Sequence, residues 1–377
     1  MQFIFQQLSV NPQQGITLAH QLKQQITWLI AAGKLEAGTL LPSVRQLAHH
    51  LGINLHTVRN AYQMLEAAGL VETRQGRGTQ VLPFDARRMA QTAAAIRTHT
   101  VGVIMASLTN PFYHAFFQGV SEVADEDQTL LFVCSTQDDP AEAWRYFTQL
   151  AARQVDGILV ASHGLVDLLY SEPGASRDGQ PIIPSVTVDW PGCAGPSVQI
   201  DLEGAGYQAT RHLLQHGHHR IGLITYASEV ANVKPVNDGY FRALQEAGIA
   251  VDPSRIARVG AFDAASGAEG ASRLISLPQP PTAIFAITDM MAVGALQALR
   301  SVGLRVPQDV ALVGFNDIPQ AAWLDPPLTT VAAPSFQMGK EAMRMLQDLI
   351  AGKPLIQQQV VLPTSLVIRH SCGEHQS

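Results

Sequence analysis

The sequence contains few cysteines, and their spacing suggests no cross-linked or metal-bound framework. Cys134, Cys193 and Cys372 are odd in number, lie far apart and include no CxxC pair. This usage argues against a disulfide scaffold and against a thiolate zinc site that could be recognised from sequence. We therefore expect the chain to function in a reducing cytoplasm.

Long apolar runs are also missing. The longest, such as PTAIFAITD, are far shorter than the ~20 residues that a membrane helix needs. The N-terminus MQFIFQQLSV has no cationic segment ahead of a long apolar one, so no export signal and no membrane partner are expected. With 377 residues, 46% hydrophobic and 15% charged, the composition is that of a globular protein with two or three domains.

Acidic residues are scarce in one part of the chain only. Residues 1–98 carry nine Lys and Arg against four Asp and Glu, whereas the remaining chain carries sixteen against twenty-seven. The net charge of −6 is therefore the sum of a basic N-terminal part and an acidic remainder. A basic segment of this kind suits contact with a polyanion such as DNA.

The stretch LPSVRQLAHHLGINLHTVRNAYQMLEAAGL, residues 41–70, predicts two short helices. Ser43 is a candidate N-cap of the first, which has apolar residues every three or four positions and ends at Gly52. Asn54 is the candidate N-cap of the second, which ends near Gly69. Two helices joined by a three-residue glycine turn are a helix-turn-helix arrangement, whose second helix enters the DNA major groove.

The flanking segments extend this motif. An amphipathic helix is expected upstream, from Leu18 to Gly33, and GLVETRQGRGTQVL predicts a hairpin with a Gly/Arg tip downstream. Together with GKLEAGTLLPSVRQLA, residues 15–82 resemble the GntR-type winged helix. The resemblance implies binding to double-stranded operator DNA through Ser43, Arg45, Asn54, Leu55, His56, Thr57, Arg59, Arg74, Gln75, Gly76 and Arg77.

One position departs from that family pattern. Leu55 stands where many members have an arginine, so an apolar contact with a thymine methyl would replace a polar base contact. For Arg45, Arg59 and His56 the alternative is that they are simply solvated helix residues. Residues 83–98, PFDARRMAQTAAAIRT, show no clear apolar face and are interpreted as a linker. The expected domains are thus 1–82, the linker 83–98, and 99–377.

From residue 99 the pattern changes to short apolar runs that alternate with amphipathic segments. Expected strands include TVGVIMA, TLLFVCS, GILVAS, IIPSVTVD, RIGLITY, TAIFAIT and DVALVGF. Such alternation predicts an α/β fold with parallel sheets in two lobes, and ligands of such folds gather at the carboxyl ends of the strands. The polar residues at these ends are Ser107, Ser162, Asp189, Thr288, Asp289, Asn316 and Asp317.

A second resemblance covers about residues 99–370. The runs THTVGVIMASLTNPFYHAFFQGV, QVDGILVAS, TRHLLQHGHHRIGLIT and PPTAIFAITDMMAVGALQALRSVGLRVPQDVALVGFND are similar to the effector-binding domain of the LacI/GalR family. The resemblance implies two Rossmann-like lobes of the periplasmic-binding-protein type, a small-molecule effector between them, and a homodimer. The combined architecture resembles that of the arabinose repressor of bacilli and implies a sugar-responsive repressor without a cofactor.

The effector positions match that family only in part. Phe112, Tyr113, Asp189 and Phe262 correspond to family ligand contacts, and Trp190 offers an aromatic face for a sugar. Val236 stands where the family usually has an arginine, with Lys234 as the candidate substitute. Thr288 and Asn316 replace a frequent asparagine and a frequent aspartate. A charged or ordinary family sugar is therefore not assumed.

Other kinds of site and protein remain as alternatives. GAGYQA, from Gly204, satisfies the G-x-G-x-x-A pattern of a dinucleotide site but has no carboxylate about twenty residues later. His212, His216, His218 and His219 are candidate metal ligands, although the family pattern accounts for GHHRI without a metal. A pyridoxal-phosphate-binding aminotransferase-like domain needs a Schiff-base lysine, and only Lys234, Lys340 and Lys353 follow residue 98. A transport-type solute-binding protein would not carry the DNA module.

Overall fold

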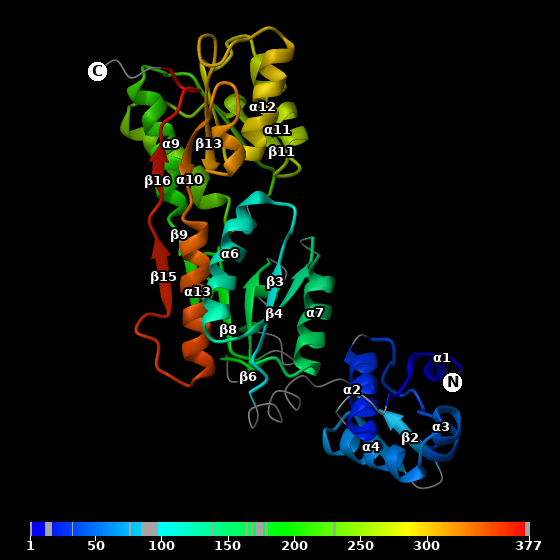
Figure 1. Cartoon of the computed structure of the whole chain (residues 1–377). Helices are drawn as coiled ribbons and strands as arrows, with labels where there is room; N and C mark the ends of the chain where they lie inside the picture. Colours follow the sequence, from blue (N-terminus) through cyan, green and yellow to red (C-terminus); the bar gives the residue numbers. More distant parts are fainter. Residues whose placement is uncertain are drawn as a thin grey trace.

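The computed structural model describes residues 2–11, 17–31, 33–74, 77–83, 97–137, 139–162, 165–166, 169–170, 176–177, 180–228 and 231–373. Figure 1 shows an N-terminal part made mainly of helices and two α/β lobes stacked on one another. Most of the expected linker, residues 84–96, lies outside the described residues. Among the residues described, no helix combines the length and the apolarity that crossing a bilayer requires.

The N-terminal part has its own apolar core. Leu22, Ile26, Leu47 and Leu65 are fully buried in it, and each such side chain stabilises the fold by roughly 1.5–3 kcal/mol. The expected helices and hairpin are confirmed. The elements are α1 (Gln2–Gln7), α2 (Leu18–Ala31), α3 (Val44–Leu51), α4 (Leu55–Ala67) and the antiparallel strands β1 (Val71–Arg74) and β2 (Gly78–Val81).

The first lobe contains a six-stranded sheet, ordered β15-β9-β8-β5-β3-β4, in which every pair is parallel. Its buried strands are near-continuous apolar runs, as expected of a parallel sheet with helices on its faces. The strands are β3 (Thr100–Met105), β4 (Leu130–Ser135), β5 (Gly157–Ala161), β8 (Ser185–Val188), β9 (Ser197–Ile200) and β15 (Gln359–Leu362). The helices are α6 (Pro111–Glu126), α7 (Pro140–Ala152) and α13 (Ser335–Ile350), and a short hairpin joins β6 (Ser176–Arg177) to β7 (Gln180–Pro181).

The second lobe repeats this plan with a sheet ordered β11-β10-β12-β13-β14-β16. Only β16 runs antiparallel to its neighbour. The strands are β10 (Ile221–Tyr226), β11 (Ile256–Val259), β12 (Ala283–Ala286), β13 (Ala311–Asn316), β14 (Thr329–Ala332) and β16 (Ser365–Val367). The helices are α9 (Leu202–Gln215), α10 (Lys234–Glu246), α11 (Ala264–Ile275) and α12 (Asp289–Ser301), with 3-10 turns η1 (Pro253–Arg255) and η2 (Pro319–Ala322). The predicted fold class is confirmed.

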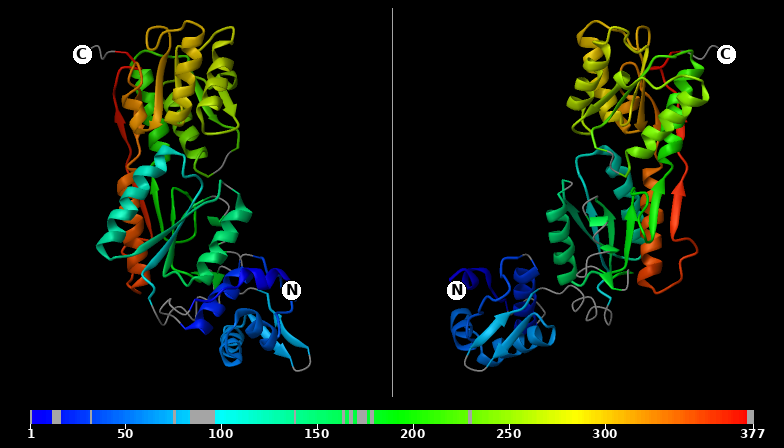
Figure 2. Two further views of the ribbon diagram at one scale, coloured as in Figure 1. Left: turned by 45° about the vertical axis from the view of Figure 1, so that its right-hand side comes forward. Right: turned by 180° about the vertical axis from the view of Figure 1, so that it is seen from behind.

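The chain passes between the two lobes three times. It leaves the first sheet after β9, returns after β14 to form α13 and β15, and crosses again to β16. Figure 2 shows α13 and β15, which come late in the sequence, packed in the same lobe as β3 and α6. Three short crossings close together allow the lobes to rotate relative to one another.

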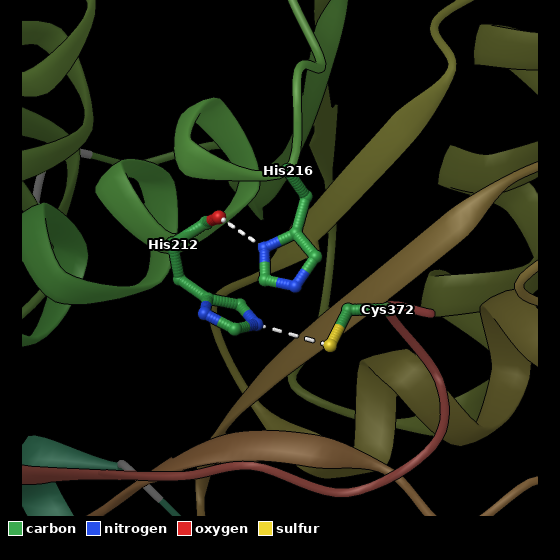
Figure 3. Close-up of side chains that lie close together, drawn as sticks. All are labelled: His212, His216 and Cys372. Carbon is green, nitrogen blue, oxygen red and sulfur yellow. Dashed lines mark hydrogen bonds between the residues drawn. The ribbon is translucent and has the colours of Figure 1, made fainter. Parts of the chain in front are cut away.

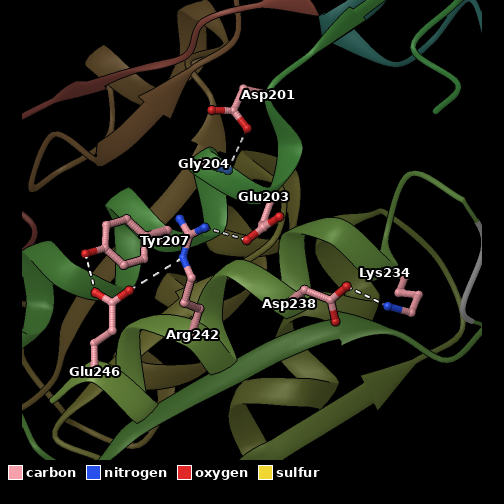
Figure 4. A network of polar contacts seen from close by, with 8 residues as sticks. All are labelled: Asp201, Glu203, Gly204, Tyr207, Lys234, Asp238, Arg242 and Glu246. Atoms are coloured by element: carbon pink, nitrogen blue, oxygen red, sulfur yellow. Dashed lines mark hydrogen bonds and ion pairs between the residues drawn. The ribbon is translucent and has the colours of Figure 1, made fainter. Parts of the chain in front are cut away.

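Helices α9 and α10 pack closely in the second lobe because both carry glycine at the contact. A Cβ at Gly206 would lie 2.0 Å from the Val236 carbonyl oxygen, and a Cβ at Gly239 would lie 2.1 Å from that of Glu203. Ion pairs and hydrogen bonds, among them Arg242 to Glu203, cover the outer side of this helix pair (Figure 4). Gly206 of GAGYQA thus serves helix packing, and Gly204 lies against the Asp201 carboxylate that caps α9, so both glycines are accounted for without a nucleotide.

Candidate functional sites

The recognition helix α4 is held by local capping. Ser43 Oγ accepts a hydrogen bond from the Gln46 amide at 3.3 Å while the Gln46 side chain accepts one from the Ser43 amide at 3.0 Å, a capping box that starts α3. Gly52 then adopts φ 65°, a left-handed conformation that ends α3 and turns the chain. Asn54 Oδ1 accepts from the His56 amide at 2.8 Å and starts α4.

The N-terminal turn of α4 presents its side chains to solvent. Asn54, Leu55, His56 and Arg59 are exposed, Leu55 at 43%, and Thr57 is half-buried. Because Leu55 is exposed rather than packed in the core, its side chain is available for the contact with a thymine methyl that the sequence predicts. These residues form one surface at the end of the helix that a major groove would receive.

Two arginines extend this surface. Arg45 and Arg59 are exposed, and neither forms an ion pair with a described residue. Arg74 in the hairpin differs, because its guanidinium pairs with Glu72 at 2.9 Å, and that hydrogen bond raises the pKa of Arg74. Arg77 is exposed, whereas Gln75 and Gly76 lie outside the described residues. Unlike Arg74, the guanidinium groups of Arg45, Arg59 and Arg77 can contact phosphates without first breaking an ion pair to a described residue. Their DNA contacts stay a prediction.

A cavity of about 720 Å³ lies between the two lobes, at the carboxyl ends of strands from both sheets. Its place agrees with the rule that ligands of open α/β sheets bind there. Eight of the eleven residues predicted for the effector site line this cavity: Ser107, Phe112, Tyr113, Asp189, Trp190, Phe262, Thr288 and Asn316. Whether they bind an effector remains a prediction.

Asp189 is the most unusual residue of the cavity. It follows β8 with φ 59°, a left-handed conformation uncommon for a residue other than glycine. Its carboxyl group is buried, and Oδ1 has no hydrogen-bond partner among the described residues. Burial raises the pKa of Asp189 to about 7. The alternative is that Asp189 is a structural acid satisfied by backbone hydrogen bonds. Its Oδ1 would then have a partner, and none is found among the described residues.

Two further cavity residues were not predicted from the sequence. Asn232 lies in the loop before α10, and its buried Oδ1 also has no partner among the described residues. Tyr226 ends β10, and its ring stacks on that of Phe262 with centroids 4.6 Å apart. Phe112 and Tyr113 pack edge to face on the opposite side, with centroids 5.1 Å apart. The cavity therefore combines aromatic walls with unpaired polar oxygens.

The cavity also has a distinctive charge. Asp189 and Asp263 are acidic, and no lysine or arginine is present among the described lining residues. Val236, which takes the place of the family's arginine, is buried in the wall. Lys234 does not compensate, because it points away and its Nζ pairs with Asp238 Oδ2 at 2.6 Å (Figure 4). The described lining thus offers an anionic ligand no basic side chain.

The structure corrects the expected placement of three residues, since Ser162, Lys234 and Asp289 do not line the cavity. Ser162 is fully buried and shares a 2.9 Å hydrogen bond with Thr136 Oγ1 behind the strand ends. Asp289 is the first residue of α12, and its carboxylate accepts hydrogen bonds from the Ile318 amide and Thr330 Oγ1. The carboxylate thus links the start of α12 to Ile318, just after β13, and to Thr330 in β14, instead of facing the cavity.

The three lysines that follow residue 98, one of which a pyridoxal-phosphate site would need, form ion pairs elsewhere. Lys234 pairs with Asp238, Lys340 with Glu122 at 2.6 Å, and Lys353 with Asp348 at 3.1 Å. None of the three lines the cavity. The geometry therefore gives no support to an aminotransferase-like domain.

Comparisons with known proteins agree with both halves of this description. Residues 18–81 match the family model described as bacterial regulatory proteins, gntR family, and residues 210–372 match that of a periplasmic binding protein-like domain. The transcriptional regulator DegA of Bacillus subtilis is 37% identical over 279 residues, 73% of this chain and 81% of DegA. The transcriptional repressor PurR of Haemophilus influenzae is 31% identical over 302 residues, 77% of this chain and 86% of PurR.

The fold of a solved structure is also similar to that of this chain. A LacI family transcriptional regulator from Enterococcus faecium, determined with bound ribose, shares 26% identity and a TM-score of 0.64, covering 73% of this chain and 98% of its own. The matched relatives are regulators of transcription, and the same two-lobed domain follows a DNA-binding module here. The chain therefore belongs to the LacI family of ligand-responsive, DNA-binding transcriptional regulators and carries a gntR-type helix-turn-helix domain at its N-terminus.

Proposed function

We propose that this regulator is a homodimeric repressor whose affinity for operator DNA is set by a neutral polyhydroxylated ligand, a sugar or a related polyol, in the cavity between the lobes. The observation that carries this proposal is the buried carboxyl of Asp189, whose Oδ1 has no hydrogen-bond partner in the described part of the chain and lies in a wall beside aromatic rings. An unsatisfied buried polar atom costs about 1–3 kcal/mol. A ligand hydroxyl that donates to it would recover this energy on binding.

The remaining walls specify the ligand class further. A carboxylate can accept hydrogen bonds from two neighbouring hydroxyls, and Asn232 Oδ1 offers a third acceptor. Trp190 and the stacked pair of Tyr226 and Phe262 provide the apolar faces on which sugar rings pack. Because the described lining residues include acids and no base, phosphosugars and sugar acids should bind poorly. The Enterococcus faecium relative, solved with bound ribose, supports a sugar.

The DNA partner follows from the exposed surface of α4 and the basic N-terminal part. One recognition helix contacts only a few base pairs, so useful affinity needs two copies on a roughly palindromic site. Arg45, Arg59 and Arg77 would contact phosphates and so make binding salt-dependent. Action on DNA supports a location in the cytoplasm.

The edge of the first sheet supports a homodimer. Strand β4 is the outer strand, and it exposes Leu130 at 69%, Phe132 at 40% and Val133 at 36%. An exposed apolar edge strand favours association with another chain. A second copy is the proposed partner, because a two-fold contact here would pair the two DNA-binding modules needed for a palindrome.

A screen with neutral sugars, polyols and phosphosugars tests the proposal. A neutral compound should raise the melting temperature, since a ligand at one hundred times its dissociation constant stabilises by about 2.7 kcal/mol. An operator selected from random duplexes would then be titrated by fluorescence anisotropy with and without this compound. Stabilisation by phosphosugars alone, or a ligand that leaves DNA affinity unchanged, would contradict the proposed effector class.

A further inference from the structure

A cluster of two histidines and a cysteine lies outside the cavity, in the second lobe (Figure 3). His212 is in the last turn of α9, His216 is the residue that ends this helix, and Cys372 follows β16. The Nε2 atom of His212 is 3.0 Å from Sγ of Cys372, and one possible ligand atom from each of the three residues lies within 4.8 Å of the others. His212 and Cys372 are each only 3% exposed.

The orientation of His216 is that of a metal-ligating histidine. Its Nδ1 lies 2.9 Å from the carbonyl oxygen of His212, and since a carbonyl can only accept, Nδ1 carries the proton. The lone pair of the imidazole is then on Nε2, which Figure 3 shows directed toward His212 and Cys372. Metal-binding histidines commonly donate their other ring N–H to a carbonyl or a carboxylate in this way.

We propose that His212, His216 and Cys372 bind one Zn²⁺ ion, with a water or a small exogenous ligand in the fourth position. Two imidazole nitrogens and one thiolate suit this ion, whereas Mg²⁺ and Ca²⁺ prefer oxygen. Around Zn²⁺ such donor atoms lie roughly 3.3–3.5 Å apart. The observed separations, from 3.0 Å to at most 4.8 Å, require shifts on the order of 1 Å.

The site would join parts of the chain that are remote in sequence. Cys372 is 160 residues from His212 and also lies 3.1 Å from Thr329 Oγ1 in β14. A cysteine binds a metal ion as the thiolate, so its thiol proton must leave when the ion binds. Binding then forms the zinc–sulfur bond as the S–H proton leaves to solvent, and affinity falls as the pH falls. The bound ion would fix the C-terminal segment to the end of α9.

The test uses the full-length protein, freed of metal with a chelator and kept reduced. Titration with Zn²⁺ against a competing chelator should show one tight equivalent per chain, released protons and a raised melting temperature, with no effect of Mg²⁺. Co²⁺ in the same site should show thiolate-to-cobalt absorption. Cys372→Ser keeps a hydrogen-bonding atom, and His216→Gln keeps a polar side chain. Each variant should weaken Zn²⁺ binding by about 100-fold, because each removes a direct ligand. Loss of a residue that only hydrogen-bonds to a ligand already lowers metal affinity by about 10- to 100-fold.

Matched controls separate this site from other histidines and thiols. His219→Gln changes an exposed histidine of the same HGHHR segment, and Cys193→Ser changes another buried cysteine, so both should bind Zn²⁺ as the parent does. Unchanged Zn²⁺ binding by Cys372→Ser, or no tight equivalent in the parent protein, would overturn the proposal. Cys372→Ser changes a buried residue, so this variant could fail to fold. In that case the cobalt spectrum of the parent protein and Zn²⁺ binding by His216→Gln decide the question, because His216 is only half-buried.

Discussion

Replacing Asp189 with asparagine should have two opposite effects. The substitution keeps the volume of the side chain and removes a carboxyl group that lies buried in the cavity wall, where no described residue forms a hydrogen bond with its Oδ1. We expect the protein without ligand to become more stable and the response to the ligand to be lost. A residue kept at a cost to stability is typical of a functional site.

The stability effect can be worked from the pKa of Asp189. Burial raises it from 3.8 to about 7 in the folded protein, so the unfolded chain loses this proton first as the pH rises. The carboxyl therefore destabilises the folded state progressively between about pH 4 and pH 7, and the penalty stays at its full value above that range. At 1.36 kcal/mol per pKa unit the penalty is at most about 4 kcal/mol. Asp189→Asn should remove it at pH 8 and change little at pH 4.

The ligand effect follows from hydrogen bonding. A hydrogen bond to a charged group contributes about 1.5–3 kcal/mol, which corresponds to roughly 10- to 150-fold in affinity. Urea unfolding between pH 4 and pH 8 measures the first effect, and effector titration of the operator complex measures the second. DNA affinity without the ligand should be almost unchanged, because Asp189 is in a different domain from α4.

A matched control is available in the same cavity. Asp263 also lines it, but its Oδ1 accepts from the Ser266 amide at 2.8 Å and caps α11. Asparagine caps helices about as well as aspartate, so Asp263→Asn should leave the free energy of unfolding at pH 8 nearly unchanged. If Asp189→Asn is the less stable protein at pH 8, or if its effector response is undiminished, the role given to this carboxyl is wrong.

Three other expectations concern the DNA module and the dimer. Arg59→Ala should weaken operator binding and reduce its salt dependence by about one phosphate contact. Arg74→Ala should have a smaller effect because Glu72 already pairs with that arginine. Equal losses of operator affinity in anisotropy titrations of the two variants would contradict this. Phe132→Asp, on the exposed edge strand β4, should give a monomer in sedimentation experiments that binds a palindromic site weakly, and an intact dimer would place the interface elsewhere. Limited proteolysis should cut within residues 83–98 and leave an effector-binding core, so unfolding of that core after the cut would show that the domain boundary is wrong.

The helix-turn-helix could be predicted from the sequence because its determinants are local. Ser43 and Asn54 cap the helices through hydrogen bonds that span two or three residues, and Gly52 adopts the left-handed conformation that ends α3. Each signal acts within one turn of its own position, so no tertiary information is needed. The longer apolar strands of both lobes were predictable for a similar reason, since a buried parallel strand is a continuous apolar run.

The cavity was only partly predictable. The rule that ligands gather at strand ends pointed equally to Asp189, which lines the cavity, and to Asp289, which does not, and the two differ in what lies beyond the strand. Past Asp189, which has φ 59°, the chain turns into a loop, whereas Asp289 begins a helix and its carboxylate accepts a hydrogen bond from Thr330 in β14. Asn232 lies in a loop without periodicity, and Tyr226 reads as the last residue of a strand. Asn232 and Tyr226 line the cavity only because of how the two lobes face one another.

The short strands and the histidine–cysteine cluster were missed because their partners are distant in sequence. Strands β9, β11, β14, β15 and β16 have only three or four residues each and depend on pairing with neighbours rather than on their own pattern. Cys372 could not be connected with His212 by spacing, since 160 residues separate them. A sequence pattern shows local periodicity, and contacts of this kind arise only when the sheet is assembled.

The position of the cavity suggests how a ligand would act on DNA binding. Asp189 belongs to the first lobe, whereas Asn232 and Phe262 belong to the second, so one occupant can contact both lobes only in a particular closure. The crossing after β9 runs along the cavity, because Ile200 and Leu202 on either side of it are lining residues. A ligand that stabilises one closure by contacts on both walls shifts the equilibrium by its differential affinity and by no more than that. Since the edge strand β4 belongs to the first lobe, a change in closure would reach the paired DNA-binding modules through the proposed dimer contact.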